Sequence, residues 1–377
     1  MEFDPILLAK RHLELIDQYR ETLNAKSKRR AEKDSHRFRI PRHCGLTVHF
    51  ARGGCPYQCS YCYIYDMDLG KNIEPYPLSP RELVYAILLN RNFISGRFGT
   101  LLAIGSITEP LIFEKHALEY FYELANLGNP IQFSTKKFIT SSFALELSRV
   151  PTPVSPLVSI ITFELSDILE PYAPKPDLRL ESIRNLSNAG LNACLFLRPI
   201  IVGINYREAY KIMDVAREYG ARCVVFGSFR ITYRIYKTLK DLGLDMSKVE
   251  ARANIKLIKK FPKRQYPVSL SRREKDRLIA YARKIGLIPF KSACCANSFN
   301  AGVVCPSICF ETSFCTNCPN NCRTQTRPSI NSLTEALRLL NIHIRLHLHN
   351  EKIFIDKKNY LKLVQTLSRR ITLPRRP

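Results

Sequence analysis

The sequence predicts an α/β protein built around a partial (β/α)6 TIM-type barrel, and three observations support this. Strand-like and helix-like segments alternate from Gly45 to about residue 230, which is typical of a parallel sheet. Apolar residues make up 45% of the 377 residues, enough for a sizeable core. A cysteine loop, Gly54–Tyr63, follows the first expected strand, and barrels carry their chemistry at the C-terminal ends of strands.

The barrel elements follow from apolar periodicity and from helix-end signals. The six expected strands are Leu46–Ala51, Thr100–Gly105, Ile131–Thr135, Leu157–Phe163, Asn192–Ile201 and Cys223–Phe226. A capping box at Ser79–Glu82 opens a helix that ends near Phe93, and a second one at Ser271–Glu274 opens a helix to about Ile285. The other expected helices are Glu114–Leu127, a helix capped by Asp177 that reaches Ala189, and Tyr206–Tyr219.

Three further regions flank the barrel, which we expect to cover residues 45–290. Residues 1–44 form a basic helical extension: an amphipathic helix over residues 1–20, then nine Lys/Arg against three acids in Arg20–Arg42. Residues 291–325 are rich in cysteine. Residues 326–377 form a small basic α+β tail, with a helix at Leu333–Leu340, a hairpin at His343–His349 and Lys352–Ile355, and a helix at Lys358–Arg369.

Charge and composition narrow the partners and the compartment. The formal net charge is +25, which favours a polyanionic partner, above all nucleic acid; an anionic membrane face or a solubility device is the alternative. No apolar run is long enough to span a membrane, and the acidic N-terminus lacks a signal-peptide core, so we expect a cytoplasmic protein. Thirteen cysteines in that compartment favour metal ligation over disulfides.

The loop after the first strand carries Cys55, Cys59 and Cys62 at C-x3-C-x2-C spacing. One short loop can bring three such thiolates to one metal centre. A [4Fe-4S] cubane takes a thiolate at each of its irons, so three protein ligands leave one iron open for a small chelating molecule. A zinc knuckle or a redox thiol pair is the alternative, but a zinc site of the usual kind would show two equal cysteine pairs.

The loop, with an aromatic residue before its third cysteine, resembles the cluster loop of radical S-adenosyl-L-methionine (SAM) enzymes. Further motifs at the expected strand ends make the chain similar to the spore photoproduct lyase-like branch of that superfamily over residues 45 to 230. These motifs are Gly105–Pro110, Ser134–Lys136, Ser159–Phe163, Glu170–Pro176, Arg179–Ile183 and Arg198–Asn205.

The resemblance implies a role for each matching position. It implies that Cys55, Cys59 and Cys62 bind the [4Fe-4S] cluster. The remaining positions would meet SAM: the backbone at Tyr61 and Tyr63 the adenine, Thr108 and Glu109 the amino group, Lys136 the carboxylate, Ser159 and Thr162 the ribose, and Gly203 the adenine through close backbone approach. Alternatively, Lys136 is an ordinary loop cation, and Ser159 and Thr162 are ordinary strand residues.

The resemblance also implies a reaction, in which the reduced cluster cleaves SAM to a 5′-deoxyadenosyl radical that abstracts hydrogen from a substrate. A reductant such as ferredoxin or flavodoxin would supply the electron. Spore photoproduct lyase itself uses a cysteine near the barrel as a hydrogen donor, and Gly105–Leu111 contains none, so we do not expect thymine-dimer repair. Cys194 and Cys223 begin strands and are expected to be buried apolar residues.

A second cysteine group predicts a second metal site. Seven cysteines lie within about thirty residues, at positions 294, 295, 305, 309, 315, 318 and 322. The spacings of x5, x2 and x3 make Cys309, Cys315, Cys318 and Cys322 the expected ligands of a second iron–sulfur cluster, with zinc as the alternative. Cys294-Cys295 could provide another ligand, a thiol facing the substrate, or a hydrogen donor.

The leading hypothesis is therefore a radical SAM enzyme that modifies or repairs nucleic acid. One alternative keeps the radical chemistry and changes the substrate to a protein, peptide or lipid. The other is a non-catalytic iron–sulfur or zinc protein that binds nucleic acid. The spacing of the cysteine loop favours the enzyme hypotheses, while the net charge of +25 favours nucleic acid as the substrate.

Overall fold

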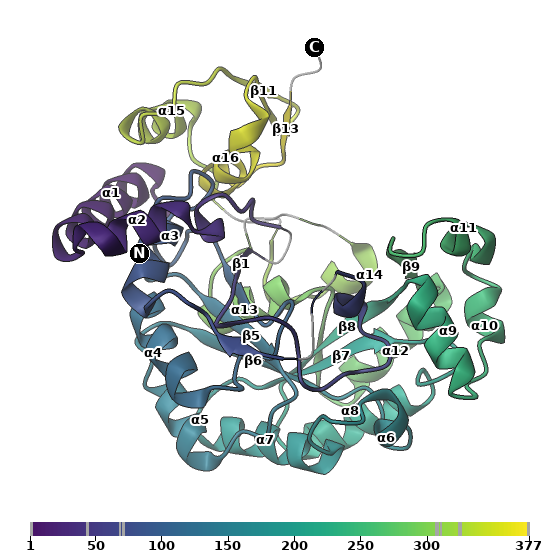
Figure 1. The fold of residues 1–377 in the computed structure, drawn as a ribbon. Helices are drawn as coiled ribbons and strands as arrows, with labels where there is room; N and C mark the ends of the chain where they lie inside the picture. Colours follow the sequence, from purple (N-terminus) through teal and green to yellow (C-terminus); the bar gives the residue numbers. More distant parts are fainter. Residues whose placement is uncertain are drawn as a thin grey trace.

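A computed structural model describes residues 3–42, 45–67, 69, 72–305, 309, 311–322 and 326–374 of the chain. The expected region boundaries at residues 44 and 325 lie outside the described residues. A parallel sheet forms the centre of the fold, with helices along its outer face (Figure 1). The α/β class and the partial barrel predicted from the sequence are confirmed.

The sheet has the strand order β1-β4-β5-β6-β7-β8-β10, and each neighbouring pair is parallel. Its strands are β1 Leu46–Val48, β4 Leu102–Ile104, β5 Ile131–Thr135, β6 Val154–Ser159, β7 Cys194–Ile200, β8 Cys223–Ile231 and β10 Ile288–Phe290. The helices that alternate with them are α3 Pro80–Leu88, α4 Glu114–Ala125, α5 Ser141–Ser148, α7 Pro176–Asn188, α8 Glu208–Glu218 and α12 Arg272–Lys284.

Local signals set the helix starts well, with one correction. Both predicted capping boxes are present, at Ser79 with Glu82 and at Ser271 with Glu274. The prediction that Asp177 caps α7 is wrong: the helix begins at Pro176, because proline at the first helical position needs no N–H partner. Asp177 lies in the first turn, where its carboxylate still favours the helix dipole.

Several strands differ from the sequence-based boundaries; the first, expected at Leu46–Ala51, ends at Val48. Two of the differences have tertiary reasons. The fourth strand was expected at Leu157–Phe163 but ends at Ser159, because the N–H groups of Phe163 and Glu164 donate to the Glu208 carboxylate instead of to a neighbouring strand. The strand expected at Cys223–Phe226 continues to Ile231, because its end pairs with the antiparallel β9 Tyr266–Val268. Helix α5 and strand β10 were not predicted.

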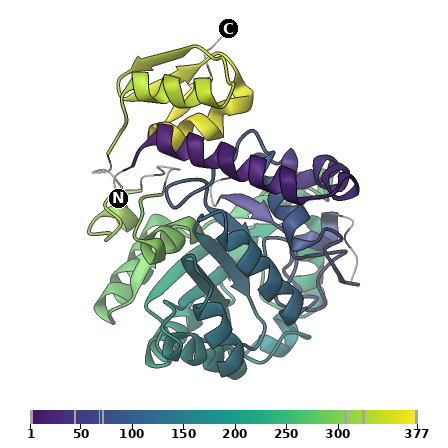
Figure 2. The same ribbon diagram turned by 90° about the vertical axis from the view of Figure 1, so that its left-hand side faces the viewer.

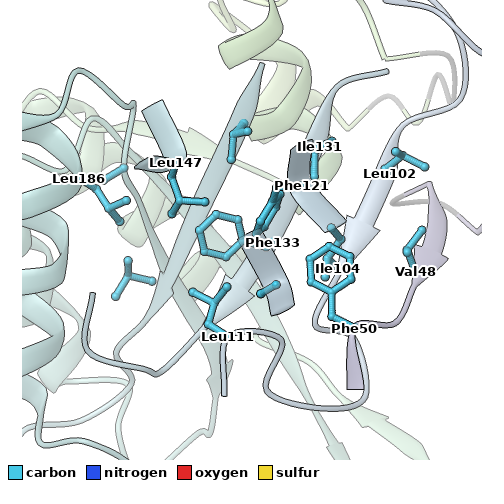
Figure 3. Packing of buried hydrophobic residues seen from close by; sticks show 14 of the residues in the cluster. Val48, Phe50, Leu102, Ile104, Leu111, Phe121, Ile131, Phe133, Leu147 and Leu186 are labelled. Carbon is cyan, nitrogen blue, oxygen red and sulfur yellow. The ribbon is translucent and has the colours of Figure 1, made fainter. Parts of the chain in front are cut away.

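A core of aliphatic and aromatic side chains fills the space between the sheet and the helices (Figure 3). Phe121 of α4 and Phe133 of β5 are fully buried, and their rings meet edge to face with centroids 5.4 Å apart. This packing holds the strands in register, and therefore places the loops at their C-terminal ends.

The two ends of the chain pack against each other. The N-terminal helices are α1 Pro5–Thr22 and α2 Ala25–Lys33; the C-terminal unit comprises α15 Ile330–Leu339, β11 Leu346–His349, β12 Lys352–Ile355, η3 Lys358–Tyr360, α16 Leu361–Ser368 and β13 Thr372–Pro374. Figure 2 shows α1 lying alongside the C-terminal unit. Leu8 of α1 shares a buried cluster with Leu333 and Leu337 of α15. The basic segment α2 packs against α3 through an ion pair of 3.0 Å between Arg30 and Glu82.

The remaining elements form an insert and several connections. The insert after β8 contains α9 Tyr233–Asp241, α10 Ser247–Glu250, α11 Ile255–Lys260 and β9. The other elements are η1 Ser35–Arg37, β2 Ala51–Arg52, η2 Tyr63–Met67, β3 Glu74–Pro75, α6 Ser166–Leu169, α13 Ala293–Ala301 and α14 Thr312–Cys315. Within the described ranges, no helix is both long enough and apolar enough to cross a bilayer.

Two leucines of α5 test the assigned core. Leu147 is fully buried, whereas Leu145 on the same helix is 48% exposed. We expect Leu147→Ala to lower the free energy of unfolding by about 2–5 kcal/mol, since it leaves a cavity, and Leu145→Ala to change it by about 0.5 kcal/mol or less. Urea denaturation measures both values, and similar losses for the two variants would contradict the packing.

Candidate active site

The parallel sheet collects the predicted SAM-contacting residues at one edge. Thr108 and Glu109 follow β4, Lys136 follows β5, and Thr162 follows β6. The cysteine loop is fixed at the same edge, since Ser60 binds the end of α6 twice: its N–H donates to the Leu169 carbonyl at 2.9 Å and its hydroxyl to the Ile168 carbonyl at 2.7 Å. Loops far apart in the sequence are thereby brought together.

The three loop thiols fit a buried cluster site. All three are free, and Cys59 is buried while Cys55 and Cys62 are half-buried. Burial raises the pKa of Cys55 to about 11 and that of Cys59 to about 12, and it also raises the pKa of Cys62. The nearby Lys136 ammonium opposes each of these rises. A metal centre would stabilise the thiolates that burial otherwise disfavours.

The two kinds of metal centre place different demands on the positions of the loop thiols. Across the described part of the chain, no three His, Cys, Asp or Glu side chains converge closely enough to share one metal ion. A zinc ion would need such convergence, with each sulfur about 2.3 Å from the ion. A cubane binds each thiolate through a different iron, so the sulfurs stay further apart.

Glu109 joins the end of β4 to the end of β5. Its buried carboxylate accepts hydrogen bonds from the Thr135 hydroxyl at 2.6 Å, the Lys136 N–H at 3.0 Å and the Leu111 N–H at 3.2 Å. Burial raises the pKa of Glu109, although these donors oppose the rise. The predicted role toward the SAM amino group stays a prediction. The structure adds that three hydrogen-bond donors hold this carboxylate in place.

A buried charge network lies beneath the loop. Glu170, just after α6, is fully buried; it accepts a hydrogen bond from the Tyr61 hydroxyl and pairs with Arg179 at 2.6 Å. Lys136 lies 3.7 Å from the same carboxylate, and its ammonium is 5.8 Å from the centre of the Tyr61 ring. Burial raises the pKa of Glu170, but the two cations outweigh it and hold that pKa below its usual range.

Lys136 stays positively charged in this network because negatively charged groups surround it. Burial lowers the pKa of the Lys136 ammonium, but negative charge on the Cys59 sulfur and on the Glu170 carboxylate outweighs it and raises the pKa above the ordinary value. The lysine therefore holds a positive charge between the cysteine loop and Glu170. The predicted role of Lys136 toward the SAM carboxylate stays a prediction, as does the alternative of an ordinary loop cation.

Arg179 is the largest fully buried side chain and was assigned no role from the sequence. Its Nη1 donates to the Ser159 carbonyl at 2.9 Å as well as to Glu170. Among the described residues, its Nε and Nη2 have no hydrogen-bond partner. An acceptor atom of a bound ligand would satisfy these donors. The motifs that begin at Glu170 and Arg179 were signals for this pair, but motif order alone did not show that they meet.

A second set of contacts holds the C-terminal end of the cysteine loop. The sequence analysis did not identify these contacts either. Asp66 of η2 accepts hydrogen bonds from the Thr232 hydroxyl at 2.8 Å and from Arg234, which pairs with it at 3.0 Å. Arg234 also donates to the Cys62 carbonyl. The insert after β8 is thus attached directly to the cluster loop.

The other predicted positions lie at this edge with their own partners. Thr162 is fully buried, and its hydroxyl donates to Glu208 at 2.6 Å. Ser159 is buried, and its carbonyl binds Arg179. Gly203 has a φ of +84°, and the Lys248 side chain fills the space where a Cβ would be. The roles of these residues, and of Tyr63 and Thr108, stay predictions.

Part of the second cysteine group lies near the N-terminal ends of the strands. Cys295 and Cys318 pack against a buried cluster that includes Cys194 and Cys223, the first residues of β7 and β8. Helix α13 crosses this end, where the Asn297 amide donates to the Pro130 carbonyl at 3.3 Å. Cys194 and Cys223 are fully buried, as expected.

With this geometry established, comparison with known proteins decides the family. The model of the Radical SAM superfamily matches residues 52–216, the segment that contains the cysteine loop. These residues are a radical SAM domain. The chain therefore contains a radical SAM domain, and the proteins of that superfamily are enzymes. The superfamily implies a [4Fe-4S] cluster and SAM, for which the three loop cysteines provide fitting donors.

Solved structures share the fold of the radical SAM domain. A spore photoproduct lyase complexed with dinucleoside spore photoproduct is 14% identical, with a TM-score of 0.54 over 72% of this chain and 86% of that one. A mutant of the lyase with bound AdoMet and the same dinucleoside has 14% identity and a TM-score of 0.54, over 69% and 81% of the two chains. No curated protein matches the sequence. At this identity the likeness shows the fold alone.

Two arginines of α7 test the buried pair in the radical SAM domain. We expect Arg179→Met to lower the free energy of unfolding by about 3–5 kcal/mol, because it leaves the Glu170 carboxylate buried without its closest cation. Arg184 pairs with Glu181 at the surface, so Arg184→Met should cost less than about 1 kcal/mol. Denaturation of the cluster-free protein measures both; equal losses would show that the buried pair is not what stabilises the site.

Proposed function

We propose that this radical SAM enzyme acts on nucleic acid, which it modifies or repairs. The observation that carries the proposal is a strongly basic, partly aromatic insert beside the cluster loop. Residues 232–271 contain ten Lys/Arg and three Asp/Glu. Phosphate contacts by such side chains supply most of the affinity of a protein for nucleic acid.

The insert presents its cations to solvent. Lys256, Lys259 and Lys260 of α11 are exposed, and the neighbouring Phe261 is 43% exposed with the Lys260 ammonium 5.6 Å from its ring. Exposed aromatic rings between cations are typical of surfaces on which bases stack while phosphates are held. A solvated charged face would not need an exposed phenylalanine at its centre.

The position of the insert relates this surface to the radical chemistry. Ile235, Met246 and Ile258 of the insert share one buried cluster with Tyr57 and Tyr61 of the cysteine loop. Strand β9 extends the C-terminal end of β8, the end at which the cluster loop lies. A strand of nucleic acid held on the insert would therefore pass close to the site where SAM binds.

Each group of residues at the site has its own proposed role. We propose that Cys55, Cys59 and Cys62 hold the [4Fe-4S] cluster, with Glu109 and Lys136 near the amino and carboxylate groups of SAM. When bound and reduced, the cluster supplies the electron that cleaves SAM and generates the 5′-deoxyadenosyl radical. Tyr61, Glu170 and Arg179 fix the loop in a buried site, and that site keeps water from the reacting groups.

Two further components belong to the proposal. A reductant such as ferredoxin or flavodoxin would supply the electron. The Cys-rich segment would hold a second metal group, because seven cysteines lie between residues 294 and 322 of the sequence. If nucleic acid does not bind, we infer a protein, peptide or lipid substrate instead.

Removing a loop thiol tests the radical chemistry. We expect anaerobically reconstituted wild-type protein to form 5′-deoxyadenosine from SAM and reductant, and Cys59→Ala to form at least about 100-fold less, since the loop loses a cluster ligand. Cys194→Ala, which removes a buried thiol outside the loop, should keep the activity. A wild-type protein that binds its cluster and never cleaves SAM would refute the proposal.

Charge removal on the insert tests the substrate. We expect the triple variant Lys256→Ala, Lys259→Ala, Lys260→Ala to bind DNA or RNA more weakly and to reduce the slope of log K against log salt by roughly 2–3. The charge-matched control Lys352→Ala, Lys357→Ala, Lys358→Ala changes the C-terminal unit, which packs on α1, and should leave the slope nearly unchanged. Absence of wild-type binding at low salt would favour another substrate class.

A further inference from the structure

Arg198 of β7 lies on the inner face of the barrel, near the C-terminal end of its strand. The residues before it alternate between two environments. Leu195 and Leu197 pack in the main core with the outer helices, whereas Cys194 and Phe196 pack in the buried cluster that includes α13. Because side chains alternate along a strand, Arg198 is on the same face as Cys194 and Phe196. It therefore points away from the outer helices.

A glycine on the neighbouring strand makes room for the Arg198 side chain. A Cβ atom at Gly227 of β8 would lie 2.2 Å from the Cγ of Arg198 and 2.3 Å from its Cδ, so the two could not coexist. Gly227 is not one of the described glycines with a positive φ, so its backbone conformation does not require glycine. The arginine explains the glycine, because only a residue without a side chain lets the Arg198 stem lie across β8.

The inner face of β8 places Arg198 between two buried apolar clusters. Val225 precedes Gly227 on this face and belongs to the cluster that packs on α13. Phe229 follows Gly227 on the same face and belongs to the cluster that contains Tyr61 of the cysteine loop. The stem of Arg198 lies over Gly227, so its guanidinium is at the level where apolar packing below gives way to the cysteine loop above.

The Arg198 guanidinium has no partner among the described residues. Arg198 is half-buried, and within the described ranges its side chain makes no hydrogen bond or ion pair. Two other arginines at this end of the sheet are paired, Arg179 with Glu170 and Arg234 with Asp66. Removing a cation from part of its water is costly unless an anion pairs with it. The position of Arg198 therefore favours an anionic ligand.

The strand register separates Arg198 from the lysine proposed for the SAM carboxylate. Ser159 of β6 is paired with Phe196 of β7, and Lys136 follows the β5 residue that is paired with Val158. Lys136 is thus level with Phe196 but two strand spacings away, about 10 Å in total. Arg198 comes two residues later on β7. Two cations in such different places suit two different anions.

We propose that Arg198 binds a phosphate group of the substrate at the C-terminal end of the barrel's inner face. A guanidinium presents paired N–H donors that match the oxygens of a phosphate. The assignment of this phosphate to nucleic acid rests on the proposed function, whereas the anion site itself does not. The lysines of α11 hold the nucleic acid at the surface, and Arg198 holds one phosphate inside the barrel. Arg198 thereby determines which part of the substrate faces the radical.

Chemical modification of arginine in the full-length, anaerobically reconstituted protein tests the site. Phenylglyoxal modifies accessible arginines, and mass spectrometry of the peptides measures the rate at each one. We expect inorganic phosphate, and separately a 5′-phosphorylated single-stranded trinucleotide, to slow modification of Arg198 roughly tenfold at about ten times the Kd of each probe. SAM alone should leave the rate unchanged. Arg222, an exposed residue that donates to Asn192, is the internal control and should keep its rate with every probe.

Variants test the contribution of Arg198 to substrate binding. We expect Arg198→Gln to reduce the slope of log K against log salt for single-stranded DNA by about 1, because one phosphate contact is lost. Gly227→Ala keeps the charge but displaces the Arg198 stem, and should reduce the slope by a similar amount. Arg222→Gln removes a cation at the opposite end of β8 and should leave the slope nearly unchanged.

Several results would overturn the proposal. These are no protection of Arg198 by inorganic phosphate, protection by SAM alone, or equal changes of slope in Arg198→Gln and Arg222→Gln. The protection measurement uses the unaltered protein, so it does not depend on the folding of any variant. Protection by inorganic phosphate without binding of DNA or RNA would refute the proposed function and leave the phosphate site intact. Salt-dependent binding of DNA without protection of Arg198 would refute the phosphate site and leave the proposed function intact.

Discussion

The buried ion pair between Glu170 and Arg179 is the interaction on which the candidate active site depends. The two side chains are fully buried, and a lone charge at that depth would be costly. Together they orient Tyr61 of the cysteine loop, the Ser159 carbonyl at the end of β6, and the Lys136 ammonium after β5. Three separate loops are thus held in one arrangement before any cofactor binds, which reduces the ordering that binding would otherwise require.

The net charge of +25 does not show where the cations lie. In the structure they form two sets, one buried near the cysteine loop and one on the surface of the insert. Inside the domain, the cations Lys136 and Arg179 are matched by Glu170 and face the cysteine loop. On the surface, the lysines of α11 have few acidic neighbours and surround an exposed phenylalanine. The buried set suits a small zwitterionic ligand and the surface set suits a polyanion. Arg234 links the two, since it belongs to the insert and binds Asp66 beside the loop.

The additions to the barrel pack against different parts of it. The C-terminal unit packs on α1 through Leu8 and Leu333, and α13 closes the N-terminal ends of the central strands. Strand β10 extends the sheet by one strand beyond β8, and the cysteine-rich segment follows immediately. A partial barrel exposes apolar surface along its open side, so α13 and β10, which contact the strands directly, stabilise the sheet.

The sequence alone determined the features that depend on neighbouring residues. The parallel α/β order, both capping boxes and the cysteine loop at Cys55 follow from periodicity and spacing, because backbone geometry acts over a few residues. Only the tertiary structure decided which distant residues meet. It ended β6 at Ser159 through Glu208, joined Tyr61 to Glu170, and bound Asn320 to the Cys295 carbonyl. Such contacts join segments 25 to 109 residues apart, and they arise from burial and charge pairing in the folded chain, which no local pattern records.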